Sequence, residues 1–276
     1  MARYLVTGGA GYVGSHVVLA LLERGDDVVV LDNLRQGHRA AVSPGAELVV
    51  GELSDHALVR DTLAGWHFDG VLHFAALSLV GESMREPLRY IAENLGNTMW
   101  LADAAVRAGV RRFVLSSTAA LFGMPTRIPI DEAENVAPVS AYGESKLMAE
   151  RGLEWADRVH GLRSASLRYF NAAGADPGGR LGEDHDPETH LIPNAVNAVL
   201  GLGPPLTVFG TDYDTPDGTA IRDYVHVADL ADAHLRVLDK LVDGPSCRYN
   251  VGSGTGASVM EVIAAVERAA GRPPGG

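Results

Sequence analysis

The sequence predicts an α/β protein with a Rossmann-type, doubly wound parallel sheet and a smaller C-terminal lobe. Three observations predict this fold. Short apolar runs alternate with helical patterns, the runs are apolar at nearly every position, and a glycine-rich turn follows the first of them. Strands of this composition are buried on both faces, so helices must cover both sides of the sheet.

Six runs are expected to form strands: residues 4–6, 28–31, 48–50, 71–74, 113–115 and 166–169. After Asn171 glycine and proline become dense, notably in 174–179 and 203–205. We therefore place one domain at 1–171 and a smaller lobe at 172–276. Some segments of the lobe, such as 226–250, are expected to pack back on the sheet.

Two late helices are legible in the sequence of the lobe. Residues 227–238 place apolar side chains at helical spacing, and Ser258 with Glu261 forms a capping-box signature. We expect both helices to pack on the sheet. The tail at 271–276 has no periodicity and cannot continue the last helix.

The composition excludes several classes of function. The chain of 276 residues is 46% hydrophobic and carries a formal net charge of −12 without a basic run, which argues against nucleic-acid binding. The single cysteine, Cys247, excludes an internal disulfide framework and favours the cytoplasm. No signal peptide and no membrane anchor are expected, because the chain enters a strand pattern at once and no apolar run is long enough to span a bilayer.

The glycine-rich turn indicates a dinucleotide site. Gly8, Gly11 and Gly14 form G-x-x-G-x-x-G, and Gly9 with the last two also satisfies G-x-G-x-x-G. A pyrophosphate reaches the amides of a helix N-terminus only where no Cβ blocks the backbone. The next strand ends in Asp32, which is expected to accept hydrogen bonds from the adenosine ribose and so favours NAD over NADP. The alternatives are a ligand-free glycine turn and a solvent-facing turn aspartate.

A second constellation indicates proton chemistry. Tyr142 and Lys146 are four residues apart and lie on one face of a helix. The ammonium is expected to lower the pKa of the phenol, which would make Tyr142 an acid–base group during hydride transfer. Upstream, residues 116–118 bring three hydroxyls to the carboxyl edge of the sheet, where Thr118 could bind the reacting oxygen. The alternatives are a chance pair on a surface helix and a strand-end turn or cap.

These motifs together resemble the extended short-chain dehydrogenase/reductase superfamily. Within it, the chain is most similar to the UDP-glucose 4-epimerases. The likeness covers nearly the whole chain, and it rests on the motifs above and on further strings at residues 73–76, 80–83, 167–171, 209–213, 217–219 and 221–227.

The resemblance implies a tightly held NAD that is regenerated in each turnover. Tyr142 would remove the proton of the sugar 4-hydroxyl as hydride leaves C4, giving a transient 4-keto sugar that rotates and regains hydride on its other face. The outcome would be interconversion of UDP-galactose and UDP-glucose. Lys146 would hold the nicotinamide ribose and tune Tyr142, and Thr118 would steady the reacting oxygen.

The resemblance also implies the contact residues of both ligands. Those expected at the cofactor are Gly8, Gly11, Tyr12, Val13, Gly14, Asp32, Asn33, Glu52, Leu53, Phe74, Ala75, Ala76, Asn94, Ser116, Tyr142, Lys146 and Tyr169. Those expected at the UDP-sugar are Ser117, Thr118, Tyr142, Asn171, His190, Leu191, Phe209, Arg222 and Tyr224. Arg222 would supply a local cation on an acidic protein. A homodimer through the helices at 87–107 and 142–160 is expected by analogy.

The chain departs from the family in four places. Thr118 stands for the usual serine, Ser78 for a lysine beside NAD, and Glu52 for an aspartate near the adenine. Family members also continue for several dozen residues with an Arg-Arg-x-Gly-Asp-like clamp, so we expect a C-terminally shortened substrate lobe.

Two other functions compete with 4-epimerisation. A sugar-nucleotide dehydratase would usually carry an Asp-Glu pair after Thr118, where this chain has two alanines. A non-catalytic NAD-binding protein would tolerate the shortened lobe, but the complete catalytic set disfavours it.

A metal site is weighed in the segment 183–190, where suitable ligands are concentrated: Glu183, Asp184, His185, Asp186, Glu188 and His190. In a Gly/Pro-rich segment a solvated loop is the preferred interpretation, so no metal is expected. His73 and His226 are expected to be a satisfied core residue and a helix cap.

Overall fold

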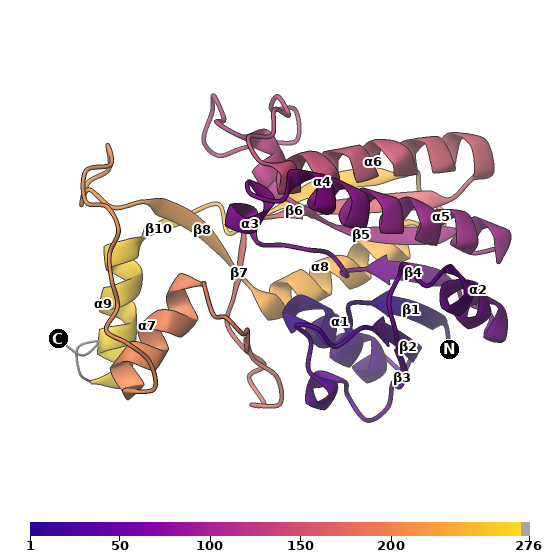
Figure 1. Ribbon diagram of the computed structural model, residues 1–276, viewed down its shortest axis with the longest axis horizontal. Coiled ribbons are helices and arrows are strands. Elements are labelled where there is room, and N and C mark those ends of the chain that lie inside the picture. The colour runs from indigo at the N-terminus through magenta and orange to yellow at the C-terminus, as the bar shows by residue number, and fades with distance from the viewer. Residues whose placement is uncertain (272–276) are drawn as a thin grey trace.

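The computed structural model describes residues 1–271, so the tail expected at 272–276 lies outside the described residues. Seven parallel strands form the main sheet, in the order β3-β2-β1-β4-β5-β6-β9 (Figure 1). Their bounds are β1 Arg3–Thr7, β2 Asp27–Asp32, β3 Glu47–Val50, β4 Gly70–His73, β5 Arg112–Thr118, β6 Arg163–Tyr169 and β9 Cys247–Val251. In the described part of the chain, no helix is long and apolar enough to cross a membrane.

Helices cover both faces of this sheet, as the apolar strands require. The longer ones are α1 Tyr12–Glu23, α2 His56–Gly65, α5 Asn97–Arg107, α6 Ala141–His160, α7 Leu191–Leu200, α8 Val227–Lys240 and α9 Val259–Ala270. Short helices are η1 Arg39–Ala41, α3 Val80–Ser83, α4 Pro87–Tyr90 and η3 Ala119–Phe122, and η2 Ile91–Gly96 is a π-helix. Helices α2, α5 and α6 cover one face, and α1 and α8 cover the other.

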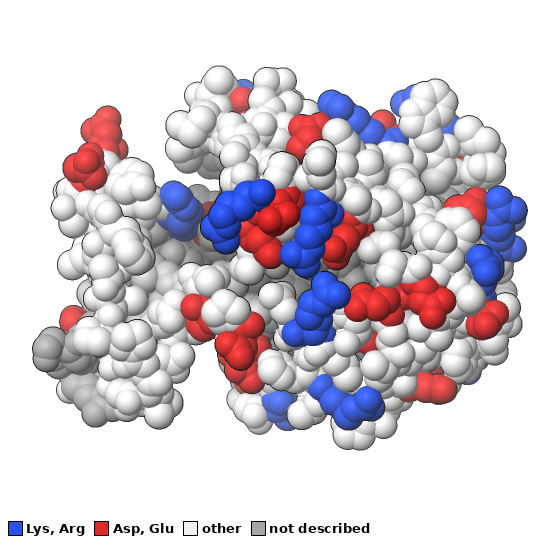
Figure 2. Space-filling model, viewed as in Figure 1, with Lys and Arg blue, Asp and Glu red and all other residues white. Residues whose placement is uncertain are grey.

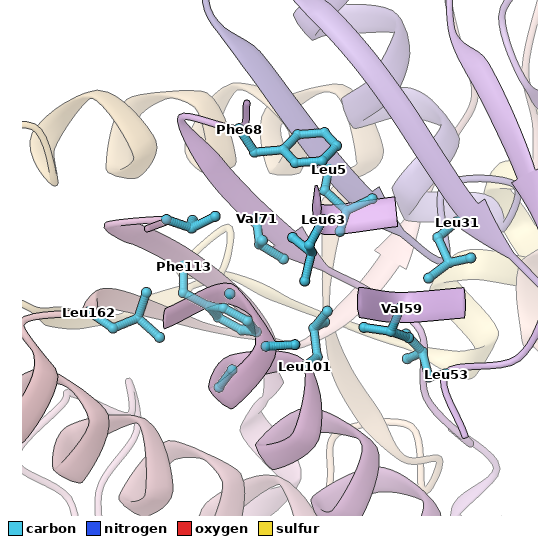
Figure 3. Close-up of a cluster of buried hydrophobic side chains, with 14 of the residues drawn as sticks. Leu5, Leu31, Leu53, Val59, Leu63, Phe68, Val71, Leu101, Phe113 and Leu162 are labelled. Carbon is cyan, nitrogen blue, oxygen red and sulfur yellow. The ribbon is translucent and has the colours of Figure 1, made fainter. Parts of the chain in front are cut away.

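Two hydrophobic cores result from the alternation of side chains along each strand. In β1, Leu5 points to the core under α2, α5 and α6, whereas Val6 points to the core under α1 and α8. Figure 3 shows the first of these cores, where Leu5 and Phe113 from the sheet lie near Leu101 of α5. Burial on both faces fixes the register of each strand, because a shift by one residue would exchange the two sets of side chains.

The smaller lobe contains a three-stranded sheet, β7 Asn171–Ala173, β8 Ile221–His226 and β10 Gly256–Ser258, in the order β10-β8-β7. Two elements that follow β8 in the sequence return to the main sheet. Helix α8 packs on α1, β5 and β6, and β9 becomes the seventh strand of the main sheet.

One expectation for this lobe is wrong. Helix α9 begins at the capping box of Ser258 and Glu261, as predicted, but it packs against α7 and β10 instead of the main sheet (Figure 1). Its buried side chains, Val262 and Ile263, face the lobe. The capping signature therefore located the helix start but carried no information on its packing partner.

Candidate active site

The glycine-rich turn joins β1 to α1 at the carboxyl end of the sheet. A Cβ on Gly8 would lie 2.5 Å from the Ala75 nitrogen, and a Cβ on Gly14 would lie 2.2 Å from the Gly8 oxygen. Gly8 also has a positive φ of 74°. These two glycines are therefore required by the packing of the turn on the next loop and on the helix.

Gly11 differs from its two neighbours in the motif. It is the N-cap of α1, no side chain caps the helix there, and a Cβ would meet only the Gly8 oxygen at 3.4 Å. The protein itself thus tolerates a side chain at Gly11, whereas an anion placed on the helix amides would not. The expected cofactor residues Tyr12 and Val13 form the first turn of α1 at this opening.

Asp32 ends β2 and is 7% exposed. One carboxylate oxygen accepts from the backbone nitrogen of Ala10 at 3.0 Å, and the other accepts from Leu34 at 2.8 Å. The Asp32 carboxylate thus joins the glycine-rich turn to the turn that follows β2. Each oxygen has a further lone pair, so Asp32 can still accept from a ribose hydroxyl.

Tyr142 and Lys146 lie in the first turns of α6, which begins at the Ser140 cap and packs on β5. The Thr118 side chain at the end of β5 lies close enough to the Tyr142 phenol to lower its pKa. The Lys146 ammonium donates to the Ser116 carbonyl at 2.9 Å. The structure therefore brings together the three side chains expected to be catalytic.

Burial dominates the proton affinities of this group. It lowers the pKa of Lys146 to about 8, although the Glu150 carboxylate acts in the opposite direction. Burial raises the pKa of Tyr142, and the Thr118 side chain offsets only part of that rise. The expected lowering of the Tyr142 pKa is not seen, because desolvation is the larger effect, and the Lys146 ammonium donates to the Ser116 carbonyl.

A buried ion pair beneath the site was missed from the sequence. Arg168 of β6 and Glu150 of α6, which are 1% and 3% exposed, are joined by three hydrogen bonds of 2.6, 3.0 and 3.2 Å. The Ser117 hydroxyl also donates to Glu150, at 2.5 Å. Ser117, expected at the substrate, thus turns its side chain into the interior. A charged residue inside an apolar strand was the available signal for this pair.

Two further residues expected at the cofactor lie at the ends of β4 and β6. Tyr169 of β6 shares a 2.5 Å hydrogen bond with the Ser116 hydroxyl, and burial raises its pKa. Phe74, directly after β4, packs on the buried ring of His234 from α8. Both Phe74 and Tyr169 were expected at the cofactor. They lie at the carboxyl ends of β4 and β6, on the edge of the parallel sheet where such folds bind ligands.

Other residues expected at the cofactor make their contacts within the protein. Asn94, in the π-helix, accepts from the Leu77 nitrogen at 2.8 Å and donates to the Leu77 oxygen at 3.0 Å. The Asn33 amide donates to Glu52 at 3.0 Å, at the edge of the turn after β2. Leu53 is buried in the core under α2. Ala75 and Ala76 continue the loop after β4, which lies against Gly8.

The expected substrate residues of the smaller lobe are gathered on its sheet. Asn171 of β7 is in register with Tyr224 of β8 and donates to the Asp223 carbonyl at 2.9 Å. Arg222 is exposed and close enough to lower the pKa of Tyr224, although burial raises that pKa overall. Figure 2 shows a hollow between this lobe and the main body, with Lys and Arg side chains along its edge. Arg222 is thus available to an anionic ligand.

Three other expected contacts lie apart from this group. Phe209 is 97% exposed in the long connection between α7 and β8. Leu191 is the first residue of α7, and His190 is its N-cap. The His190 ring is directed at Glu183 and Glu188, to each of which its Nδ1 lies at 2.9 Å.

Comparison with known proteins gives concordant results. The family model of the NAD dependent epimerase/dehydratase family matches residues 4–252. A UDP-glucose 4-epimerase of Lacticaseibacillus casei is 47% identical over 268 residues, 97% of this chain and 81% of that protein. The solved structure of UDP-glucose 4-epimerase from Brucella ovis in complex with NAD has a TM-score of 0.94 at 44% identity, covering 97% of this chain and 82% of that one.

A second solved structure is that of UDP-glucose 4-epimerase from Bifidobacterium longum in complex with NAD+ and UDP. It has a TM-score of 0.94 at 37% identity and covers 99% of this chain and 85% of that one. These likenesses confirm both the Rossmann-type fold and the resemblance that the sequence motifs indicated.

Proposed function

Because the chain belongs to the NAD dependent epimerase/dehydratase family, we propose that it interconverts UDP-galactose and UDP-glucose by inverting C4 of the hexose. The observation that carries the proposal is the convergence of Tyr142, Thr118 and Lys146 at the carboxyl ends of β5 and β6. The substrate is inferred from the names of the relatives, and the acid–base group of the site fits the proposed reaction.

The residues that would hold NAD lie in the glycine-rich turn, at the carboxyl ends of the strands and in α6. Gly11 leaves room for the pyrophosphate over α1, Asp32 accepts from the adenosine ribose, and Lys146 lies within reach of the other ribose. Phe74 and Tyr169 would line the cofactor site at the strand ends. When bound, NAD supplies a hydride acceptor at the substrate carbon and returns the hydride later in the same turnover.

The protein's own groups move the proton. Tyr142 takes the proton of the C4 hydroxyl as the 4-keto sugar forms, and it gives the proton back when hydride returns to the opposite face. Thr118, beside Tyr142, positions the reacting oxygen. Lys146 remains largely protonated at neutral pH, because its pKa is about 8, and its charge stabilises the phenolate that forms on Tyr142.

The two parts of the chain would divide the work. Residues 1–171 form the nucleotide-binding domain, and residues 172–276 form the substrate lobe, from which 226–250 returns to the sheet. Asn171 and Arg222 would bind the diphosphate, with Tyr224 beside the nucleotide. Support comes from the exposed guanidinium of Arg222 on β8 of a protein that is acidic as a whole.

The proposal is tested by incubating purified, NAD-supplemented protein with UDP-galactose and measuring UDP-glucose. Tyr142→Phe should retain NAD and lose at least about 10²-fold in rate, since it removes the acid–base group. Tyr249→Phe is the matched control, because its hydroxyl accepts from the exposed Lys240 and lies outside the Tyr142 group. No turnover by the wild-type protein would exclude the activity, and unchanged activity of Tyr142→Phe would exclude that residue from the mechanism.

We also propose that the protein is a cytoplasmic homodimer joined through α5 and α6. The two helices lie side by side on one outer face of the sheet (Figure 1), and α6 exposes Trp155 and Val159 by 63% and 65%. Large exposed apolar side chains on a helix face are typical of an interface. Light scattering at micromolar concentration should give twice the mass of one chain, and a monomer would contradict this arrangement.

A further inference from the structure

Four side chains between β7 and α7 converge on one point. The ligand atoms of Glu183, His185, Glu188 and His190 all lie within 4.8 Å of one another. His190 Nδ1 is 2.9 Å from an oxygen of each glutamate, and His185 Nδ1 is 3.3 Å from Glu183 and 3.6 Å from Glu188. The segment is a loop, as expected, and most of its residues are exposed, but these four side chains are gathered at one place. Glu183, His185 and Glu188 are half-buried, whereas Asp184, Asp186 and His190 are exposed.

The two carboxylates of this cluster have the imidazoles of His185 and His190 as their basic partners. The Glu183 and Glu188 side chains are only 8% and 12% exposed. Among the described residues, neither forms an ion pair with Lys or Arg, whereas nearby Arg180 pairs with Asp176. Two adjacent carboxylates removed from water repel each other and need a cation between them.

One imidazole of the cluster has an unused lone pair. His185 Nδ1 is buried and makes no hydrogen bond, although it is directed at both glutamates. His185 is held there by the Tyr12 ring, which meets it edge to face at 6.2 Å between centroids. A buried nitrogen aimed at two carboxylates without bonding either has the geometry of a metal ligand whose ion lies between them.

We propose that Glu183, His185, Glu188 and His190 bind one Zn²⁺ ion. Zinc takes four nitrogen and oxygen ligands at about 2.0–2.2 Å, so neighbouring ligand atoms of a tetrahedral site lie about 3.4 Å apart. The imidazole–carboxylate distances of 2.9–3.6 Å, in which His185 faces one oxygen of Glu188 and His190 the other, lie around that value, and one ligand atom from each residue lies within 4.8 Å of the others. Calcium is disfavoured because it requires six to eight oxygens.

Four protein ligands close the coordination sphere, so the site is structural. It would tie the segment before α7 to the glycine-rich turn, because Tyr12 contacts His185 and donates to the Gly174 carbonyl at 2.7 Å. His190 begins α7 itself. The ion would therefore hold the substrate lobe against the cofactor end of the main sheet, whichever nucleotide sugar the enzyme accepts.

The test uses untagged protein stripped with a chelator, reloaded with ZnSO₄ and freed of excess metal. Elemental analysis should find about one zinc per chain, and zinc should raise Tm by about 5 °C or more. Glu183→Gln and His185→Asn should abolish both effects. Asp186→Asn is the matched control, because it changes an exposed carboxylate of the same segment and should keep both.

The wild-type measurement does not depend on the folding of any variant. Less than about 0.2 zinc per chain after loading, with no change in Tm, would overturn the proposal. So would equal zinc retention by the wild type and both ligand variants, or stoichiometric uptake of Mn²⁺ in place of Zn²⁺ from an equimolar mixture.

Discussion

Replacing Lys146 by methionine should make the nucleotide-free protein more stable at pH 7. Lys146 is 3% exposed, and burial lowers its pKa from 10.5 to about 8. That difference corresponds to about 3 kcal/mol of unfavourable burial of the charged form. The variant also loses the bond to the Ser116 carbonyl, which costs about 1 kcal/mol. The net expectation is a gain of about 2 kcal/mol.

The stability gained by Lys146→Met should decrease as the pH rises. Between pH 8 and 10.5 the unfolded lysine is protonated and the folded one is not, so the unfolded state binds more protons and wild-type stability rises with pH. Methionine contributes no such rise. The difference between variant and wild type should therefore fall by about 3 kcal/mol from pH 7 to about 10.5, as the wild type recovers.

Urea unfolding of nucleotide-free protein at several pH values measures this difference, because other titrating groups contribute equally to both proteins. A variant that is less stable at pH 7 would refute the reasoning, and so would a difference that is constant with pH. Saturating NAD should reverse the order, since Lys146 is proposed to bind the cofactor.

Substitutions at five further positions test the site. Gly11→Ala should fold normally but weaken NAD binding at least about tenfold by calorimetry. Gly14→Ala should instead lower Tm, because its Cβ meets a backbone oxygen at 2.2 Å. Equal effects of the two substitutions on NAD binding and Tm would contradict the separate roles assigned to Gly11 and Gly14. Glu150→Gln should cost about 3–5 kcal/mol in urea unfolding by leaving a buried guanidinium unpaired, and adding Arg168→Met should restore part of that loss. Asp32→Ala removes the acceptor of two backbone bonds, so NAD affinity and Tm should both fall; an unchanged affinity would exclude its role at the ribose.

The main sheet was largely predictable because its strands are apolar on both faces. The six predicted runs lie in β1 to β6, apart from one residue, Phe74, which follows β4. Strand β9 was not predicted, since Arg248 and Asn250 interrupt its pattern at the edge of the sheet, where one side is open to solvent. The packing partner of α9 was also beyond the sequence, because an amphipathic helix specifies a buried face and not its neighbour.

The grouping of Tyr142, Lys146 and Thr118 was predictable because their spacing and their place on the helix and at the strand end are local features. Long-range contacts were not. The pairing of Glu150 with Arg168 joins α6 to β6, and it left only a charged residue in an apolar strand as its trace. The pKa of Tyr142 was predicted in the wrong direction, since burial is a property of the assembled fold and not of the i, i+4 spacing.

The return of α8 and β9 to the main sheet bears on how the chain is synthesised. When the ribosome has released only the first 171 residues, β6 has no partner on its outer edge, and the apolar surface that α8 covers is bare. Such an intermediate exposes a strand edge and a hydrophobic face, which favour aggregation. The lobe must therefore emerge before the first domain is complete. Fragments that end near residue 171 should accordingly need a chaperone or be degraded, although they hold every residue of the proton-transfer group.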